Sequence, residues 1–345
     1  MRRFEELDAL RGIAAFSVVL SHLTAMWPQK DLGFRFGATG VDLFFIISGF
    51  VILLTLDGKK TGMDFVVSRF SRLYPAYWTA VSLTTAAVFV RHGWDPVTQV
   101  IAPSRFLANL TMVQHYLRSA DIDDVYWTLV IELSFYAGML ILFLLKGIKH
   151  AEAIGAGSLP FALVFHSSWM KTGWPHAHDF LINWLPIVCF FPLFVAGICF
   201  YRIRTRGANR WRYALVAFCY LTQLTLFTEG GISRFVVTFG EYAAILSIYF
   251  ALFLLFAHDR LHFLVNRITL FLGKISYSLY LCHRYLGMSL IMPYLIDKRG
   301  AGFWTAFFIA LFSVVAIAYL VNRFIETPCI RYIRDRYKHV GQPHS

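Results

Sequence analysis

Long apolar segments recur along almost the whole chain, and short polar stretches separate them. A membrane-spanning helix needs about 20 mostly apolar residues, and roughly ten segments of this chain reach or approach that length. The pattern therefore predicts an all-α bundle of about ten membrane helices. The predicted spans are 8–27, 39–56, 73–90, 127–145, 151–166, 181–201, 213–228, 235–257, 270–294 and 303–324.

The composition agrees with this pattern. Of 345 residues, 58% are hydrophobic and only 15% are charged, and the mean hydropathy is +0.58. Soluble domains are about 25% charged, so this chain has too little polar surface to form a water-soluble globule. The five cysteines form no C-x-x-C pair, which disfavours disulfide and zinc sites, and we expect no bound metal.

Basic residues are unevenly distributed between alternate loops. The net charge is +12, and the loops on the side of the N-terminal "MRR" are the richer in Lys and Arg. Cytoplasmic loops carry that excess, so we expect both termini in the cytoplasm and no nucleic-acid partner. The basic stretches are "LDGKKTGMDFVVSRFSR", "KGIKH", "YRIRTRGANRWR", "HDRLHFLVNR" and "CIRYIRDRYKH".

The largest predicted outer segment runs from His92 to Val125. Its stretch "RFLANLTMVQHYLRS" is compatible with a short interfacial helix, and "ADIDD" makes its end acidic. No Gly/Ser linker and no soluble domain is recognisable at either end of the chain. We therefore expect one integral-membrane domain over residues 1–345.

A few ionisable side chains lie inside the predicted spans. A charged residue at the centre of a membrane helix costs about 2.5–3.5 kcal/mol. Such residues usually face a protein interior or a wet cavity, and they mark function. The set consists of Arg11, His22, Asp42, Glu132, Lys274, His283 and Arg284.

Arg11 and His22 are eleven residues apart in the first predicted helix. Eleven steps of 100° return to within about 20° of the starting direction, and the rise separates the two residues by about 16 Å. One helix face therefore offers a cation near the inner surface and an imidazole deeper in the membrane. The alternative is that Arg11 reaches to lipid headgroups and His22 makes a structural hydrogen bond.

The stretch "YWTLVIELSFY" places Glu132 inside the predicted span 127–145. Thr128 and Tyr136 lie one turn away on the same helix face. A carboxylate at that depth needs a partner, and an imidazole or an arginine would serve. The alternative is a structural ion pair that holds two helices together.

The stretch "GKISYSLYLCHR" carries a polar stripe. Ser276, Tyr280 and His283 follow the spacing i, i+4, i+7 and so share one helix face. The stripe is either part of a functional site or a hydrogen-bonded seam between helices.

Two arginines precede a proline in "SRFSRLYPAYW". Arg69 and Arg72 are three residues apart and lie just inside the predicted inner surface. Anchoring by positive charge explains them, and so does a site for an anionic ligand.

Six pieces of the sequence, in this order, resemble the acyltransferase-3 family of membrane acyltransferases. The resemblance extends over about residues 4–330, and Thr128 stands where the family usually has Ser. The pieces are Arg11 with His22, "GVDLFFIISGFVI", "SRFSRLYPAYW", "WTLVIELSFY", "ISYSLYLCH", and Glu326 with Thr327 and Pro328.

The resemblance implies transfer of an acyl group, often acetyl from acetyl-CoA, to a hydroxyl of a carbohydrate or glycolipid. Acyl-CoA is then a donor substrate rather than a tightly bound cofactor, and the expected location is the bacterial cytoplasmic membrane, among its lipids. Some members carry an additional hydrolase-like domain, which we do not expect here. The acceptor and the length of the acyl chain are open.

By this resemblance His22 and Arg11 are catalytic. An alcohol is a poor nucleophile at neutral pH, and a histidine that takes its proton contributes about 10²–10⁴-fold. Glu132, or in second place Asp42, would stabilise the imidazolium that forms. A covalent acyl-histidine intermediate is an alternative to direct transfer.

The phosphates of acyl-CoA are expected to bind cytoplasmic cations, for which Arg69, Arg72 and Arg11 are the candidates. A tetrahedral intermediate also needs hydrogen-bond donors for its oxyanion, and Tyr280, Ser48 or backbone amides could supply them. Trp127 and His283 are further site candidates from the same motifs.

The main competing function is a transporter or flippase for a lipid-linked glycan, because intramembrane His, Glu and Arg also form transport paths. Such proteins commonly contain internal repeats, and no repeat is recognisable here. A structural or assembly protein would not require this set of buried ionisable groups.

Overall fold

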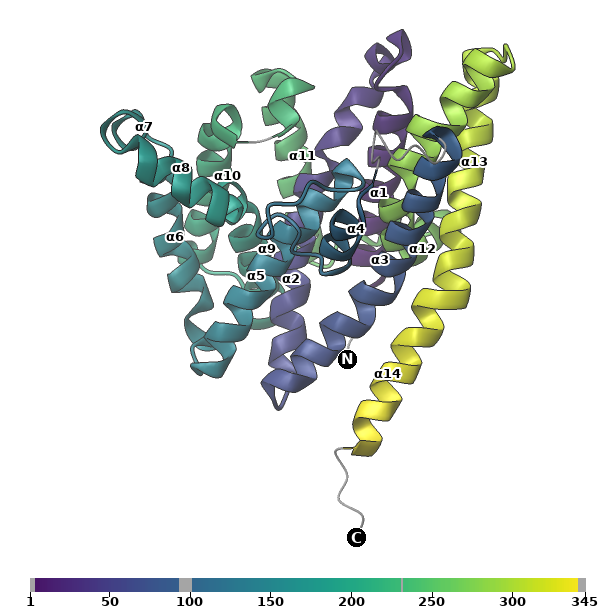
Figure 1. Ribbon diagram of the computed structural model, residues 1–345. Coiled ribbons are helices and arrows are strands. Elements are labelled where there is room, and N and C mark those ends of the chain that lie inside the picture. The colour runs from purple at the N-terminus through teal and green to yellow at the C-terminus, as the bar shows by residue number, and fades with distance from the viewer. Residues whose placement is uncertain (1–3, 93–100, 231, 341–345) are drawn as a thin grey trace. The chain divides into compact units, whose positions relative to one another are not determined.

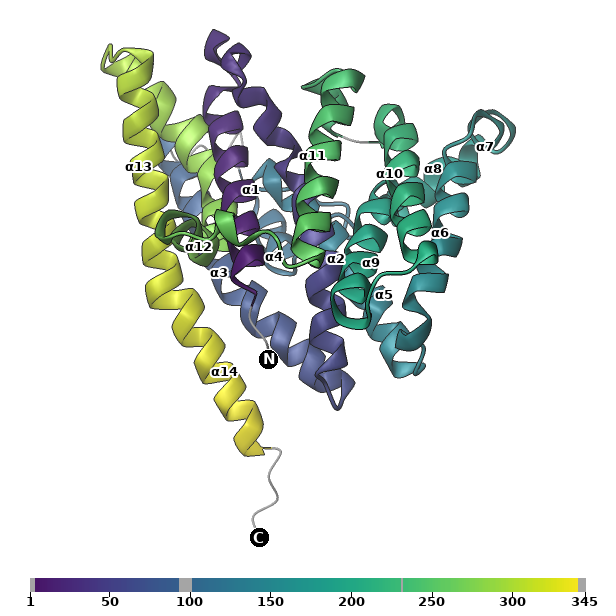
Figure 2. The same cartoon turned by 180° about the vertical axis from the view of Figure 1, so that it is seen from behind.

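The computed structural model describes residues 4–92, 101–230 and 232–340, and this part of the chain is helical without any strand. The chain forms two compact units, whose helices Figures 1 and 2 show from opposite sides. Helix α1 (Glu5–Thr24) contributes to both. The first unit comprises Met1–Ala14, Ala38–Gly62 and Ile131–Leu270, and the second comprises Ala15–Gly37, Met63–Val130 and Phe271–Ser345.

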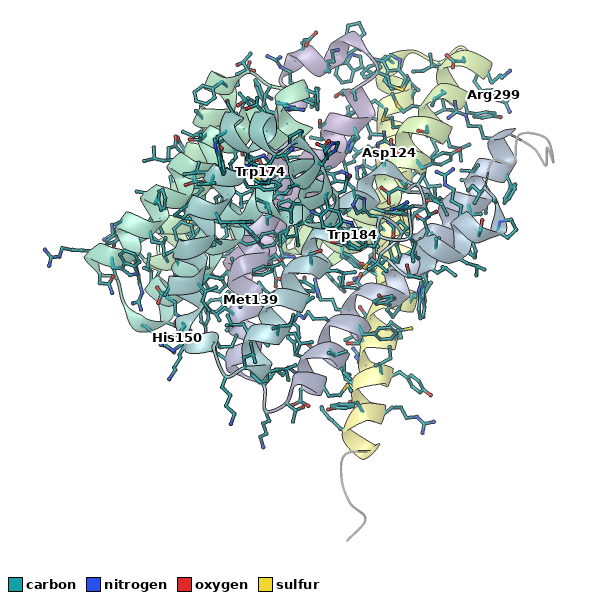
Figure 3. The ribbon with its side chains drawn as sticks, turned by 60° about the vertical axis from the view of Figure 1, so that its left-hand side comes forward. Asp124, Met139, His150, Trp174, Trp184 and Arg299 are labelled. Carbon is teal, nitrogen blue, oxygen red and sulfur yellow. The ribbon has the colours of Figure 1, made fainter. Side chains whose placement is uncertain are left out.

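The first unit consists of long helices together with the short helices α7 and α8, which connect α6 to α9. Figure 3 labels Trp174 and Trp184, which lie at the two ends of α8. The helices are α2 (Gly40–Asp57), most of α5 (Trp127–Leu144), α6 (Ala151–Phe165), α7 (Ser168–Gly173), α8 (Pro175–Trp184), α9 (Phe191–Arg206), α10 (Arg210–Gly230) and α11 (Phe239–Ala257).

Helices α2 and α9 approach each other to backbone contact. A Cβ atom added to Gly49 would lie 2.1 Å from the carbonyl oxygen of Phe194, and one added to Gly197 would lie 2.1 Å from that of Ile46. Only glycine leaves room for this approach. Small residues at a crossing are the usual way in which membrane helices pack closely.

The second unit holds the remaining helices. Helix α12 continues directly into the π-helical segment η8, and α13 continues through the π-helical turn η10 into α14, so that the last two helices form one rod (Figure 1). The elements are α3 (Gly62–His92), α4 (Pro103–Leu110), α12 (Arg267–His283), η8 (Arg284–Ile291), η9 (Tyr294–Lys298), α13 (Phe303–Val321), η10 (Asn322–Glu326) and α14 (Thr327–Val340).

The glutamate of the Glu-Thr-Pro motif has a structural position. Its buried carboxylate accepts hydrogen bonds from the Ser278 hydroxyl at 2.7 Å and from the Asn322 side-chain amide at 3.0 Å. The same amide nitrogen donates to the carbonyl oxygen of Lys274 at 3.0 Å. Glu326 therefore fixes α12 to the junction between α13 and α14.

The all-α prediction is confirmed for the described residues. Within the described part of the chain, seven segments are long and apolar enough to cross a membrane. The other three predicted spans fall on helices α6, α10 and α12. The number ten and the cytoplasmic position of the termini stay predictions. The "MRR" at 1–3 and residues 93–100 of the large outer segment lie outside the described residues. In the described part of the large outer segment, α4 confirms that a short helix is present. The seven segments are Glu5–Thr24, Phe34–Asp57, Gly62–Arg91, Asp124–Leu144, Pro186–Arg206, Phe239–Ala257 and Phe303–Lys338.

Candidate active site

Two histidines from distant parts of the chain are in direct contact in the second unit. His22 lies on α1, and His283 is the last residue of α12. The Nδ1 atom of His22 is 2.8 Å from the Nε2 atom of His283, and the ring centroids are 4.9 Å apart. The sequence drew attention to each imidazole separately, and the structure shows that they form a hydrogen-bonded pair.

The surroundings of His283 determine where the protons lie. Its side chain is fully buried, and its Nδ1 atom is 2.9 Å from the carbonyl oxygen of Tyr280 and 3.2 Å from that of Leu279. A carbonyl oxygen only accepts, so Nδ1 must carry the proton and Nε2 of the neutral ring must accept. His22 therefore donates from Nδ1. When the His22 ring is neutral, its Nε2 atom then carries a lone pair, which is the form that a general base requires.

The Tyr280 hydroxyl is engaged in a seam between α12 and the start of α5. It lies 2.8 Å from the Thr128 hydroxyl and 3.2 Å from the carbonyl oxygen of Val125. Ser276 of the same polar stripe donates to the carbonyl oxygen of Gly273 within its own helix at 2.9 Å. The seam interpretation thus fits Tyr280 and Ser276, whereas His283 at the end of the stripe contacts the other imidazole.

An ion-pair cluster lies directly after His283. Arg284 is 2.5 Å from a carboxylate oxygen of Asp124 and 3.8 Å from one of Asp123. The buried Asp123 also accepts a hydrogen bond from the backbone N–H of Tyr285 at 3.1 Å. Figure 3 labels Asp124, which comes from the acidic end of the large outer segment. In the sequence the "ADIDD" stretch stands out only as acidic, and no pattern connects it with the histidines.

The predicted residues Arg11, Asp42 and Glu132 belong to the first unit. Glu132 accepts hydrogen bonds from the Ser48 hydroxyl at 3.0 Å and from the Tyr136 hydroxyl. Helix spacing indicated Tyr136 as a neighbour of Glu132, whereas the sequence suggested Ser48 only as an oxyanion donor and did not place it beside Glu132. These two hydroxyls, together with Glu132, form a polar contact between α2 and α5.

Asp42 is buried on α2 and hydrogen bonds with Tyr242 of α11. Its Oδ2 atom has no hydrogen-bond partner among the described residues. Arg11 is partly exposed on α1. Trp127 begins α5 in the second unit, one residue before Thr128.

Arg69 and Arg72 lie on α3 in the second unit, both partly exposed. The Arg69 guanidinium lies over the Phe65 ring, 5.9 Å from its centroid. At Leu73, the residue after Arg72, α3 is fixed to α12, because the Tyr277 hydroxyl donates to the Leu73 carbonyl oxygen at 3.0 Å. The helix that carries the two arginines is therefore held against the helix that carries His283.

Comparison with known protein families shows which family contains this chain. The family model described as an acyltransferase domain, that of the acyltransferase-3 family, matches residues 4–323. The chain belongs to this family. The match includes both histidines of the pair and both arginines of α3, and the prediction of an O-acyltransferase enzyme is confirmed at this level.

Several curated proteins are similar to this acyltransferase-3 protein. Nodulation protein 10 of Rhizobium leguminosarum bv. viciae is 24% identical over 94% of this chain and 92% of its own length. The exopolysaccharide production protein ExoZ of Rhizobium meliloti is 34% identical over 30% of this chain and 33% of its own length. A protein of Staphylococcus aureus (strain COL), named as an O-acetyltransferase by proposal, is 25% identical to this chain. The match covers 95% of this chain and 57% of the Staphylococcus aureus protein. No solved structure matches.

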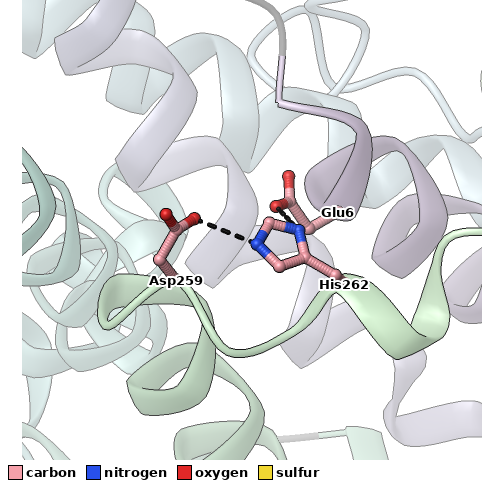
Figure 4. A group of neighbouring side chains, drawn as sticks. All are labelled: Glu6, Asp259 and His262. Carbon is pink, nitrogen blue, oxygen red and sulfur yellow. Dashed lines mark ion pairs between the residues drawn. The ribbon is translucent and has the colours of Figure 1, made fainter.

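One group of side chains in the acyltransferase-3 protein has the spacing of metal ligands. In the first unit, the two ring nitrogens of His262 lie 2.8 Å from Glu6 and 3.4 Å from Asp259 (Figure 4). Arg204 also pairs with Asp259. Each imidazole nitrogen already faces a carboxylate, and an arginine compensates one of these, so an ion-pair network explains the group without a metal.

Burial of Asp123 gives a pH-dependent stability that can be measured. Burial raises the pKa of this carboxyl from 3.8 to about 6, against the opposing effects of the Tyr285 N–H and Arg284. The folded state then holds the proton more tightly than the unfolded chain does. The resulting stabilisation, about 3 kcal/mol, is present below pH 4 and is lost as the pH rises through 6.

We therefore expect the melting temperature of the wild-type protein to fall between pH 5 and pH 7 by more than that of the Asp123→Asn variant. Asp31→Asn is the matched control, because Asp31 is an exposed acid outside the Arg284 cluster, and its pH dependence should follow the wild type. Equal pH dependence of the wild type and Asp123→Asn would show that this carboxyl does not titrate in that range.

Proposed function

We propose that this acyltransferase transfers an acyl group, most simply acetyl, from acyl-CoA to a hydroxyl of a carbohydrate on the outer side of a bacterial cytoplasmic membrane. The observation that carries the proposal is the imidazole pair. In the neutral ring of His22, the hydrogen bond from Nδ1 to His283 leaves Nε2 unprotonated. A neutral, oriented imidazole is the group needed to activate an alcohol.

The reaction follows from that proton arrangement. Nε2 of His22 takes the proton of the acceptor hydroxyl while the hydroxyl oxygen attacks the thioester carbon. The tetrahedral intermediate collapses, the carbon–sulfur bond breaks, and the proton on His22 passes to the leaving CoA sulfur. His283 keeps the ring of His22 in one tautomer throughout, because its own Nδ1 proton is held by the Tyr280 carbonyl.

Glu132 is our candidate for the carboxylate that stabilises the imidazolium of His22 during the reaction, with Asp42 in second place. Both are buried or hydrogen-bonded acids in apolar helices. Acids at such positions usually have a functional role. Direct transfer needs no further nucleophile, whereas a stable acyl-histidine would appear as a burst of CoA release without acceptor.

Arg69 and Arg72, together with Arg11, are proposed to hold the phosphates of acyl-CoA. Arginine suits phosphate because its planar guanidinium forms paired, charge-assisted hydrogen bonds. The excess of basic residues in alternate loops indicates that this end of α3 faces the cytoplasm, where acyl-CoA is present.

A carbohydrate acceptor is supported by the name of one relative, which refers to exopolysaccharide production. The acidic residues near Arg284, at the proposed outer side, are compatible with a neutral sugar and would repel an anionic donor.

Sealed proteoliposomes that contain the purified full-length protein test the proposed function. Labelled acetyl-CoA is added only at the face that carries the C-terminus, and a carbohydrate acceptor is enclosed on the opposite face. We expect acylation of the enclosed acceptor. Activity only when both substrates share one face would contradict the two-sided arrangement, and movement of a glycan without consumption of acyl-CoA would support the transporter instead.

A further inference from the structure

The C-terminal helix places a third arginine beside the two arginines of α3. Arg334 of α14 donates from Nε to the Ser71 hydroxyl at 3.2 Å and from Nη2 to the Ser68 carbonyl oxygen at 3.4 Å. Ser68 and Ser71 are buried and directly precede Arg69 and Arg72 in the sequence. Helix α14, the lower part of the rod in Figure 2, is thus hydrogen-bonded to α3 through Arg334.

Two of the three arginines, Arg72 and Arg334, have no acidic partner among the described residues. Arg69 and Arg72 are both close enough to Arg334 to repel its charge. Within residues 4–92, 101–230 and 232–340, neither Arg72 nor Arg334 has an acidic side chain within ion-pair distance, and the neighbouring Asp335 pairs with Lys338 instead. Like charges held together at a partly buried surface are costly unless an anion binds between them.

The orientation of Arg334 leaves a donor for a ligand. The two serines engage Nε and Nη2, so they fix the plane of the guanidinium and leave Nη1 available. Planar arginines fixed in this way are the usual recognition elements for phosphate oxygens.

The position of the group relative to the imidazole pair suits a long donor molecule. Tyr277 of α12 contacts Leu73, the residue after Arg72, and lies six residues before His283 in the same helix. Six residues correspond to about 9 Å along the helix axis. The arginines and the histidines therefore lie at different heights along α12 within one unit. In acyl-CoA, the phosphates and the thioester are likewise separated along the length of the molecule.

We propose that Arg334, with Arg72 and Arg69, forms a phosphate-binding site, and that the phosphate groups of acyl-CoA occupy it. This inference rests on the proposed function for the identity of the ligand. The phosphate of an anionic lipid headgroup has the same chemistry, so the experiment must separate the two sources.

The full-length protein is reconstituted in nanodiscs of uncharged phosphatidylcholine, and binding of CoA is measured by calorimetry. We expect Arg334→Gln and Arg72→Gln each to weaken CoA binding by about 10–100-fold, the usual effect of losing a charge-assisted hydrogen bond. Arg334→Lys should be intermediate. Arg331→Gln is the matched control, because Arg331 is exposed on the same helix, and it should bind like the wild type.

In the transfer assay, Arg334→Gln should raise the KM for acyl-CoA and leave kcat and the acceptor KM nearly unchanged. A wild-type KM in a folded Arg334→Gln protein that still transfers acyl groups would overturn this inference alone. Absence of transfer by the wild type would overturn the proposed function as well. Binding of phosphatidylglycerol, but not of CoA, that is lost in Arg334→Gln would assign the site to lipid and overturn its assignment to the donor.

Discussion

Replacement of His22 by alanine is expected to lower kcat by about 10²–10⁴-fold, the contribution of a positioned general base. The expectation rests on the hydrogen bond to His283, which leaves Nε2 of His22 free to accept a proton. The variant should still insert and fold, because a helix tolerates alanine well and His22 is only partly buried.

The measurement is the turnover of purified protein with acetyl-CoA and excess acceptor, together with a melting curve. His176→Ala is the matched control, because His176 is an exposed imidazole on α8, and it should retain wild-type turnover. Glu132→Gln, measured alongside, should lower kcat with little change in the donor KM if Glu132 stabilises the imidazolium. Near wild-type turnover by a folded His22→Ala protein would exclude His22 as the base.

The next largest effect is expected at His283, and its size should depend on whether the replacement can accept a hydrogen bond. His283→Phe fills the space and removes the acceptor for Nδ1 of His22, so the ring can adopt the wrong tautomer. We expect kcat to fall on the order of 10²-fold or more, as in other catalytic histidines that lose their orienting partner. His283→Gln keeps an acceptor oxygen, and we expect a smaller loss of roughly tenfold.

The two variants are compared because both remove the imidazole of residue 283, and only His283→Phe removes the hydrogen-bond acceptor for Nδ1 of His22. Turnover is measured across pH 5–9 with the melting temperature of each variant as the control for folding. Equal losses in His283→Phe and His283→Gln would show that His283 does more than accept a hydrogen bond. Unchanged turnover in both variants would exclude any role in positioning His22.

The helices could be predicted from the sequence because membrane helices have a strong local signal, a run of apolar residues of sufficient length. The end of the last helix could not. The predicted span stops at residue 324, yet the helix continues through η10 into α14, which is rich in charged residues. In a charged segment, helix propensity and packing determine whether a helix continues, and the length of an apolar run carries no information about either.

The individual residues of the candidate site could be predicted from the sequence, but the contacts between them could not. His22 and His283 stand out because imidazoles are rare in apolar helices, but they are 261 residues apart in the sequence, and no periodicity relates them. The same holds for Ser48 beside Glu132 and for Arg334 beside the arginines of α3. A count of basic residues treats all cations of one membrane face alike, so it could not single out Arg334.

The glycine crossing of α2 and α9 affects how a mutational scan of this enzyme should be read. At Gly49 and Gly197 a single added methyl group would meet the backbone of the opposite helix, which has no rotamer to change. Any substitution there will remove activity as completely as loss of a catalytic group, but through failed assembly. Inactive variants at these two positions should therefore be classified by the amount of protein in the membrane, and a drop in that amount separates them from inactive variants at the imidazole pair.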